Sequence, residues 1–111
     1  MSVDESATID FVALDKITGD ITLAISDHLH WDDKILHVNL MMQKINTYIE
    51  FVETRQVYET FTQQDGQKIF IQVTHKYQIP TFALKFFEQI RELLNGHNLE
   101  LRMKYLPDDP N

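Results

Sequence analysis

The residues best suited to chemistry lie in one short segment, residues 27–33, which holds two histidines, three aspartates and a tryptophan. Imidazole nitrogens and carboxylate oxygens together suit divalent metals such as zinc or nickel. One hypothesis is therefore a divalent-cation site formed by His28, His30 and Asp32, which Asp27 or His37 could complete. No other cofactor is expected.

A purely structural explanation of the same segment needs no ligand. Asp32 is placed to be the N-cap of the helix that follows, because an aspartate there accepts hydrogen bonds from first-turn N–H groups. Trp31 would then pack over the edge of a sheet, and Asp27 would cap the loop. The sequence favours this explanation, because no His-x-His-x-Asp spacing is diagnostic of a metal site. Asp27, His28 and Trp31 stay candidates for ligand binding.

Motifs of known catalytic chemistry are missing from the sequence. With three glycines and no cysteine it has neither a glycine-rich phosphate loop nor a thiol nucleophile, and no Gly-x-Ser-x-Gly element occurs. Ser26 stands beside Asp27 and His28, but neighbouring residues of a strand point to opposite faces. We expect a binding or interaction domain without catalysis of its own. The alternatives are a metal-dependent or hydrolytic enzyme using residues 28–33, and an immunity- or antitoxin-like inhibitor.

The elements that must position these residues follow from hydrophobic periodicity. Residues 9–15 and 21–26 alternate around Gly19 and predict a β-hairpin. Helical spacing runs from Asp32 to about Glu53, and again from Pro80 to Gly96. Further strands are expected over residues 69–77 and 99–105, and the sequence leaves open whether residues 57–61 form a short additional strand.

The polarity of the strands predicts the layering of the fold. Each later strand has one apolar and one mixed face, whereas a sheet covered on both sides would be apolar throughout. We therefore predict an α+β two-layer sandwich, a mixed four- or five-stranded sheet with two helices on one face. Ile45 and Phe86 should be buried in its core. A single domain over residues 1–111 is expected, with flexible tails at residues 1–7 and 107–111.

The sheet face left open by the helices is a second candidate for binding. Three bases should point to it and could hold an anion, while Phe70 could stack on a ring. An RNA-binding platform of this kind would need several aromatic residues and a basic domain. Pairing of these bases with Glu100 and Asp10 is the alternative explanation. The bases are Lys76, Arg102 and Lys104.

Charge and apolar content restrict the partners and the compartment. The net charge of -7 arises within the first 33 residues, and such a field disfavours nucleic acid and suits a basic protein partner or a cation. Solubility alone would also explain it. Because no stretch approaches the roughly 20 apolar residues of a membrane helix, and the missing cysteines fit a reducing compartment, we expect a cytoplasmic protein.

Three apolar residues fall opposite the expected core face of the first helix. At 100° per residue, Leu36, Leu40 and Phe51 lie far from the predicted core positions. We predict that the protein forms a homodimer through these three residues. The alternative is that residues 56–68 fold over them, with Tyr58 and Phe61 as the cover. The predicted core positions are Val38, Met41, Met42, Ile45, Ile49 and Val52.

Several short runs resemble a known family. The resemblance covers most of the chain and implies a bacterial cytoplasmic domain, without assigning catalytic residues. It is a family of short bacterial proteins of unknown function, and its N-terminal signature is carried here by Ile9-Asp10-Phe11, Asp15-Lys16, Thr18-Gly19, Ile25-Ser26-Asp27-His28-Leu29 and Trp31. The segments Lys44-Ile45-Asn46 and Lys76-Tyr77 are also similar.

Overall fold

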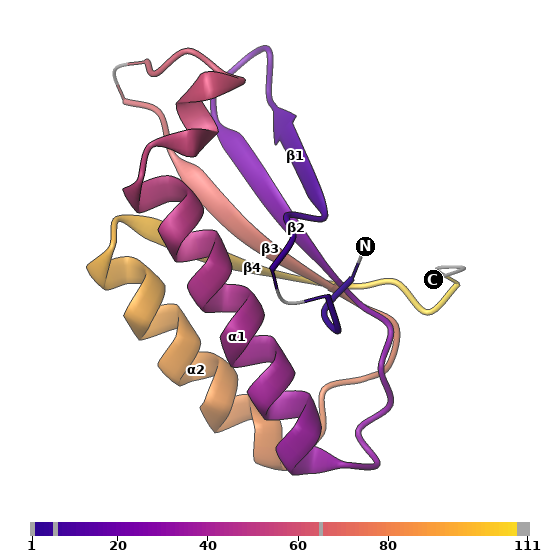
Figure 1. The fold of residues 1–111 in the computed structure, drawn as a ribbon. Coiled ribbons are helices and arrows are strands. Elements are labelled where there is room, and N and C mark those ends of the chain that lie inside the picture. Colours follow the sequence, from indigo (N-terminus) through magenta and orange to yellow (C-terminus); the bar gives the residue numbers. More distant parts are fainter. Residues whose placement is uncertain (1, 6, 65, 109–111) are drawn as a thin grey trace.

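The computed structural model describes residues 2–5, 7–64 and 66–108. Within them the chain forms one four-stranded mixed sheet in the order β1-β2-β3-β4, with β1 antiparallel to β2 and the other neighbours parallel. Both long helices lie against the same face of this sheet (Figure 1), so the predicted two-layer α+β sandwich is confirmed. The elements are β1 (Phe11–Leu14), β2 (Ile21–Asp27), α1 (Lys34–Glu53), the 3-10 helix η1 (Gln56–Glu59), β3 (Ile69–His75), α2 (Thr81–Gly96) and β4 (Leu99–Tyr105).

The core forms where alternate strand residues meet the buried stripes of the two helices. In β2, Ile21, Leu23 and Ile25 are fully buried, and the residues between them face away from the helices. Ile45 of α1 is fully buried, as predicted. Phe86 is only partly buried, and this prediction is wrong. The buried residues of α2 are Ala83, Phe87, Ile90 and Leu94, a spacing that turns Phe86 sideways toward α1.

Residues 57–61, for which the sequence left a short strand open, form no strand. Arg55 adopts a left-handed conformation with φ of 64°, which reverses the chain directly after α1. The 3-10 helix η1 follows and places Val57 fully inside the core. Tyr58 and Phe61 also pack against the core. A helical turn thus brings Val57, Tyr58 and Phe61 to the same side of the chain, facing the core.

The N-terminal residues described by the structure contact the folded core. Val3 is fully buried and its N–H donates to the carbonyl of Ser26, at 2.9 Å. The Lys44 ammonium of α1 donates to the carbonyls of Glu5 and Thr8, each at 2.6 Å. The flexible tail expected at residues 1–7 thus contacts the folded core at these residues, and its flexibility stays a prediction. Residues 109–111 of the expected C-terminal tail lie outside the described residues.

The start of α1 differs by one residue from the prediction. Asp33 is the N-cap, with its carboxylate accepting a hydrogen bond from the Leu36 N–H at 3.0 Å. Asp32 is exposed and stands one residue earlier. None of the described helices is both long and apolar enough to cross a membrane.

Candidate functional site

The loop between β2 and α1 is closed by a buried carboxylate–imidazole pair. Asp27, the last residue of β2, lies 2.7 and 2.9 Å from Nε2 of His37 on α1. Nδ1 of His37 faces the carbonyl oxygen of His30 at 3.0 Å. Both ring nitrogens therefore lie within hydrogen-bond distance of oxygen atoms, so the imidazole is held on both sides. The pair links the end of a strand to the first turns of a helix.

Trp31 seals this pair from solvent. Its ring stacks on the His37 imidazole with centroids 3.5 Å apart and an angle of 14°. Phe82 and Phe87 of α2 contact the same indole edge-on. The His37 side chain is consequently 1% exposed. A histidine with both nitrogens engaged and its face covered can fix the loop in place, but it has no free nitrogen to offer a substrate.

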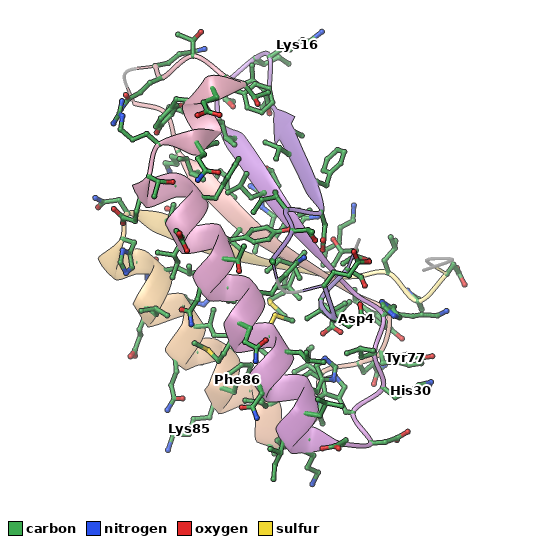
Figure 2. The ribbon with its side chains drawn as sticks, in the orientation of Figure 1. Asp4, Lys16, His30, Tyr77, Lys85 and Phe86 are labelled. Carbon is green, nitrogen blue, oxygen red and sulfur yellow. The ribbon has the colours of Figure 1, made fainter. Side chains whose placement is uncertain are left out.

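The predicted metal ligands do not come together. His30 stacks on Tyr77, with ring centroids 3.9 Å apart, and the two rings lie side by side in Figure 2. Asp32 is exposed, and Nδ1 of His28 is buried without a partner among the described residues. In the described part of the chain, no three histidine or acidic side chains gather into a metal-binding group. Of the proposed ligands, only Asp27 and His37 meet, and they bind each other.

The open face of the sheet collects the other predicted residues. Arg102 and Lys104 lie on β4 beside Gln72 and Thr74 of β3. The Arg102 guanidinium sits 4.0 Å from the centroid of the Phe70 ring, an attractive cation–π geometry. The prediction that Phe70 stands beside the bases is therefore confirmed, although its ring already carries Arg102.

Small residues form the middle of this face, and bases border it. Thr22, Ala24 and Ser26 of β2 separate Phe70 on β3 from Phe11 on β1. Lys76 occupies the next open-face position after the end of β3, and its N–H donates to the Asp27 carbonyl. Neither Lys76 nor Lys104 forms an ion pair with any residue that the structure describes. The expected pairing with Asp10 is wrong, since Asp10 binds Lys44 instead.

A second buried polar cluster was missed by the sequence analysis. Lys44 is fully buried, and its ammonium lies 2.7 Å from the Asp10 carboxylate. The hydroxyl of Tyr48 donates to the Ala24 carbonyl at 2.5 Å and accepts from the Asp10 N–H at 2.8 Å. The other Asp10 oxygen accepts from the Ser26 N–H at 3.0 Å. The sequence did contain a signal for this cluster: Lys44 stands between Met41 and Ile45, on the helix face that was expected to be apolar.

Most acids of the first third have structural partners. Besides Asp10, Asp27 and Asp33, Asp20 accepts from the Lys68 N–H at 2.9 Å. Asp15 caps the β1–β2 turn by accepting from two backbone N–H groups, which lowers the pKa of its carboxyl. The acidic excess is therefore divided among separate caps and clamps. This distribution weakens the case for a basic partner.

The predicted dimer stripe is only partly free. Leu40 and Phe51 are partly buried and pack against the core of their own chain. Phe51 also lines a hollow with Ala7, Ile9 and Gln56, so the N-terminal segment and the start of η1 border it. Tyr58 and Phe61 pack against the core, and the alternative, in which they cover the stripe itself, stays a prediction. Leu36 alone of the three is largely exposed.

Comparison with known proteins gives a family for this fold. A family model described as a family of unknown function, DUF6572, matches residues 1–107. No curated protein and no solved structure matches the chain. The matched range contains both buried clusters and the open sheet face. Because the match spans nearly the whole sequence, the chain belongs to the family of unknown function DUF6572.

Proposed function

We propose that this protein is a binding domain without catalysis of its own, which holds an acidic protein partner on the open face of its sheet. The observation that carries the proposal is the Arg102–Phe70 stack, with Lys104 two residues further along β4. Two bases, Arg102 and Lys104, and one acid, Glu100, share the open side of β4, and Lys76 directly follows the last residue of β3. Positive charge is thus concentrated on one face of a molecule whose net charge is -7.

The chemistry of the face favours a protein over other anions. A small ligand needs a concave pocket that buries most of its surface. On the open face, β2 presents a row of small side chains, which does not form such a pocket. A nucleic acid would bring a continuous row of phosphates against a strongly acidic molecule. A protein surface with a few carboxylates and apolar residues matches the bases together with the exposed ring of Phe11. Aromatic residues and arginine are also the usual anchors of protein interfaces.

The loop at residues 27–33 supports the same proposal because its polar residues are not arranged for catalysis. The Asp27–His37 pair beside this loop has the residue types of a catalytic pair, but it lies under Trp31 with both ring nitrogens engaged. A general base must reach the proton that it removes. The pair therefore fits a structural role, in which it holds β2 to α1. We further propose a bacterial cytoplasmic setting, supported by the family resemblance and by the lack of cysteine.

The proposal can be tested with synthetic peptides and amide chemical-shift mapping by NMR. One 12-residue peptide would contain glutamate, aspartate and leucine, and its matched control would carry glutamine and asparagine in place of the acids. We expect the acidic peptide to shift the amides of Gln72, Arg102 and Lys104 at low ionic strength. Replacing both bases, as R102E with K104E, should weaken binding by at least about tenfold, since 1.4 kcal/mol corresponds to that factor.

Lys16, in the β1–β2 turn, provides the matched control (Figure 2). The Lys16→Glu variant changes the net charge by the same amount per site but should leave the affinity within about twofold, because the turn lies outside the open face. Equal binding of the neutral peptide, or shifts confined to the helices, would contradict the proposal. A protein captured from cell extract would count only if, once purified, it binds the original protein and fails to bind the doubly substituted variant.

A further inference from the structure

An apolar groove runs along the outer side of the helical layer, between α1 and α2. The two helices run in the same direction (Figure 1). The groove contains two adjoining hollows of about 290 and 190 Å³. The first is bordered by Ile35, Val38 and Phe82, and the second by Met42, Phe86 and Leu93. From Phe82 to Leu93 the groove is roughly 16 Å long, at 1.5 Å per residue.

Apolar side chains stand exposed beside these hollows. Ile35 is 76% exposed, Phe82 40% and Leu93 37%. Single exposed apolar residues are common, but here they border the same groove as partly buried Val38, Met42 and Phe86. Figure 2 shows Phe86 between the two helices and Lys85 projecting outward from α2. The surface therefore offers both protrusions and recesses of apolar character, which is the shape required for packing against a copy of itself.

The charges beside the groove specify how a second copy would be oriented. Lys85 and Glu92 are exposed and seven residues apart on α2, so they lie on the same flank of the groove. If the two α2 helices met antiparallel about a two-fold axis near residue 88, Lys85 would face Glu92 of the second copy, twice. In the same register Gln89 would lie nearest the two-fold axis, with Phe86 on one side of it along α2 and Leu93 on the other. A parallel arrangement would instead place like charges together.

We infer that the protein forms a two-fold symmetric homodimer through the α1–α2 groove, with the α2 helices antiparallel. The interface is isologous, as is usual for dimers. It differs from the surface predicted by the sequence, because it uses Ile35 rather than its neighbour Leu36. It also leaves both open sheet faces accessible, on the outer sides of the dimer. A dimer would therefore present two copies of the face on which we propose that a partner binds.

Sedimentation equilibrium from about 1 to 100 µM tests this dimer. We expect the protein to be mostly dimeric at the upper concentration, corresponding to a dissociation constant on the order of micromolar. Ile35→Glu should weaken association at least about 30-fold, because it places a charge in the apolar groove. Leu36→Glu and Leu84→Glu are matched controls, since these residues are 52% and 54% exposed and lie on other flanks of the helices. Both should leave association unchanged.

A charge exchange tests the orientation. Lys85→Glu and Glu92→Lys should each weaken association several-fold, and the double variant should recover most of the original affinity. Because all these residues are exposed, a thermal melt of each diluted variant should resemble that of the original protein. A clean monomer at 100 µM would overturn the inference, as would a dimer that Leu36→Glu dissociates and Ile35→Glu does not. Failure of the double variant to recover would overturn the antiparallel arrangement.

Discussion

Polar side chains on the two faces of the sheet differ in burial and in whether they have partners. On the face covered by the helices, Lys44, Tyr48 and Asp27 are buried and each is hydrogen-bonded. On the open face, Lys104 lies exposed without an ion-pair partner among the described residues. The covered side thus uses its polar groups to hold elements together. The open side leaves its charges available to another molecule, and this is where a binding function is best sought.

Desolvation explains why every polar group on the covered side needs a hydrogen-bond or ion-pair partner. Removing a charge from water costs several kcal/mol, and only close, well-placed partners offset that cost. Each buried group therefore has to be placed against specific oxygens or N–H groups as the chain folds. An exposed base keeps its hydration and needs no partner. Substitutions on the two faces should consequently differ in their effect on stability, and the following experiments use that difference.

The largest effect is expected for Lys44→Met. The thioether side chain fills similar space but leaves the Asp10 carboxylate buried and without its cation. Loss of one member of a buried ion pair typically costs about 3–5 kcal/mol. Urea denaturation should show a decrease of this size in the free energy of unfolding, while Lys16→Met should change it by less than about 0.5 kcal/mol. A decrease below 1 kcal/mol would mean that the Lys44 cluster is not the clamp described above.

Asp27→Asn should have the next largest effect. The amide keeps the shape of the carboxylate but not its charge, and hydrogen bonds to charged groups contribute about 1.5–3 kcal/mol. A loss of stability in that range is expected from urea denaturation. Trp31, the only tryptophan, stacks on His37 and should report the change through its fluorescence in the folded state. An unaltered emission spectrum together with unaltered stability would show that the pair does not hold the loop.

Tyr48→Phe should cost about 1–3 kcal/mol at neutral pH, because the Ala24 carbonyl and the Asp10 N–H lose their partner. Burial raises the pKa of the Tyr48 hydroxyl above its ordinary value near 10. As the pH rises past 10, the unfolded chain loses this proton first, so the stability of the original protein should fall with pH. The Tyr48→Phe variant lacks this contribution. Urea midpoints measured from pH 8 to 11 should therefore decline less steeply for the variant than for the original protein. Equal declines for the two proteins would argue against a buried Tyr48 hydroxyl.

Substitutions on the open face should have the smallest effect. Arg102→Ala loses a cation–π contact with Phe70, which contributes about 0.5–1 kcal/mol at an exposed site. Lys104→Ala should change the free energy of unfolding by less than about 0.5 kcal/mol. Thermal unfolding of both variants is a sufficient measurement. A loss above 2 kcal/mol for either would erase the contrast between the two faces, because it would give these bases a structural role.

The part of the fold that sequence periodicity could predict is the part with local causes. One-sided alternation in β2 and β4 indicated a sheet covered on one face, and the helical spacing located α1 and α2 to within a few residues. The same patterns could not fix the rotation of each helix about its axis. Val38, Met42 and Phe86 were expected in the core, yet they are partly buried, whereas His37, which was not among the predicted core positions, is buried.

The partners of the polar residues were decided only by the tertiary structure. The sequence determined that Asp27, His37, Lys44 and the open-face bases would be polar groups on regular elements. Which of them would be neutralised depended on contacts such as Lys44 with Asp10, residues 34 positions apart in the chain. Periodicity carries no information about such pairs, because it reflects burial along one element. Desolvation, which makes pairing obligatory for Lys44 and unnecessary for Lys104, is set only when the helices cover one face of the sheet and leave the other open.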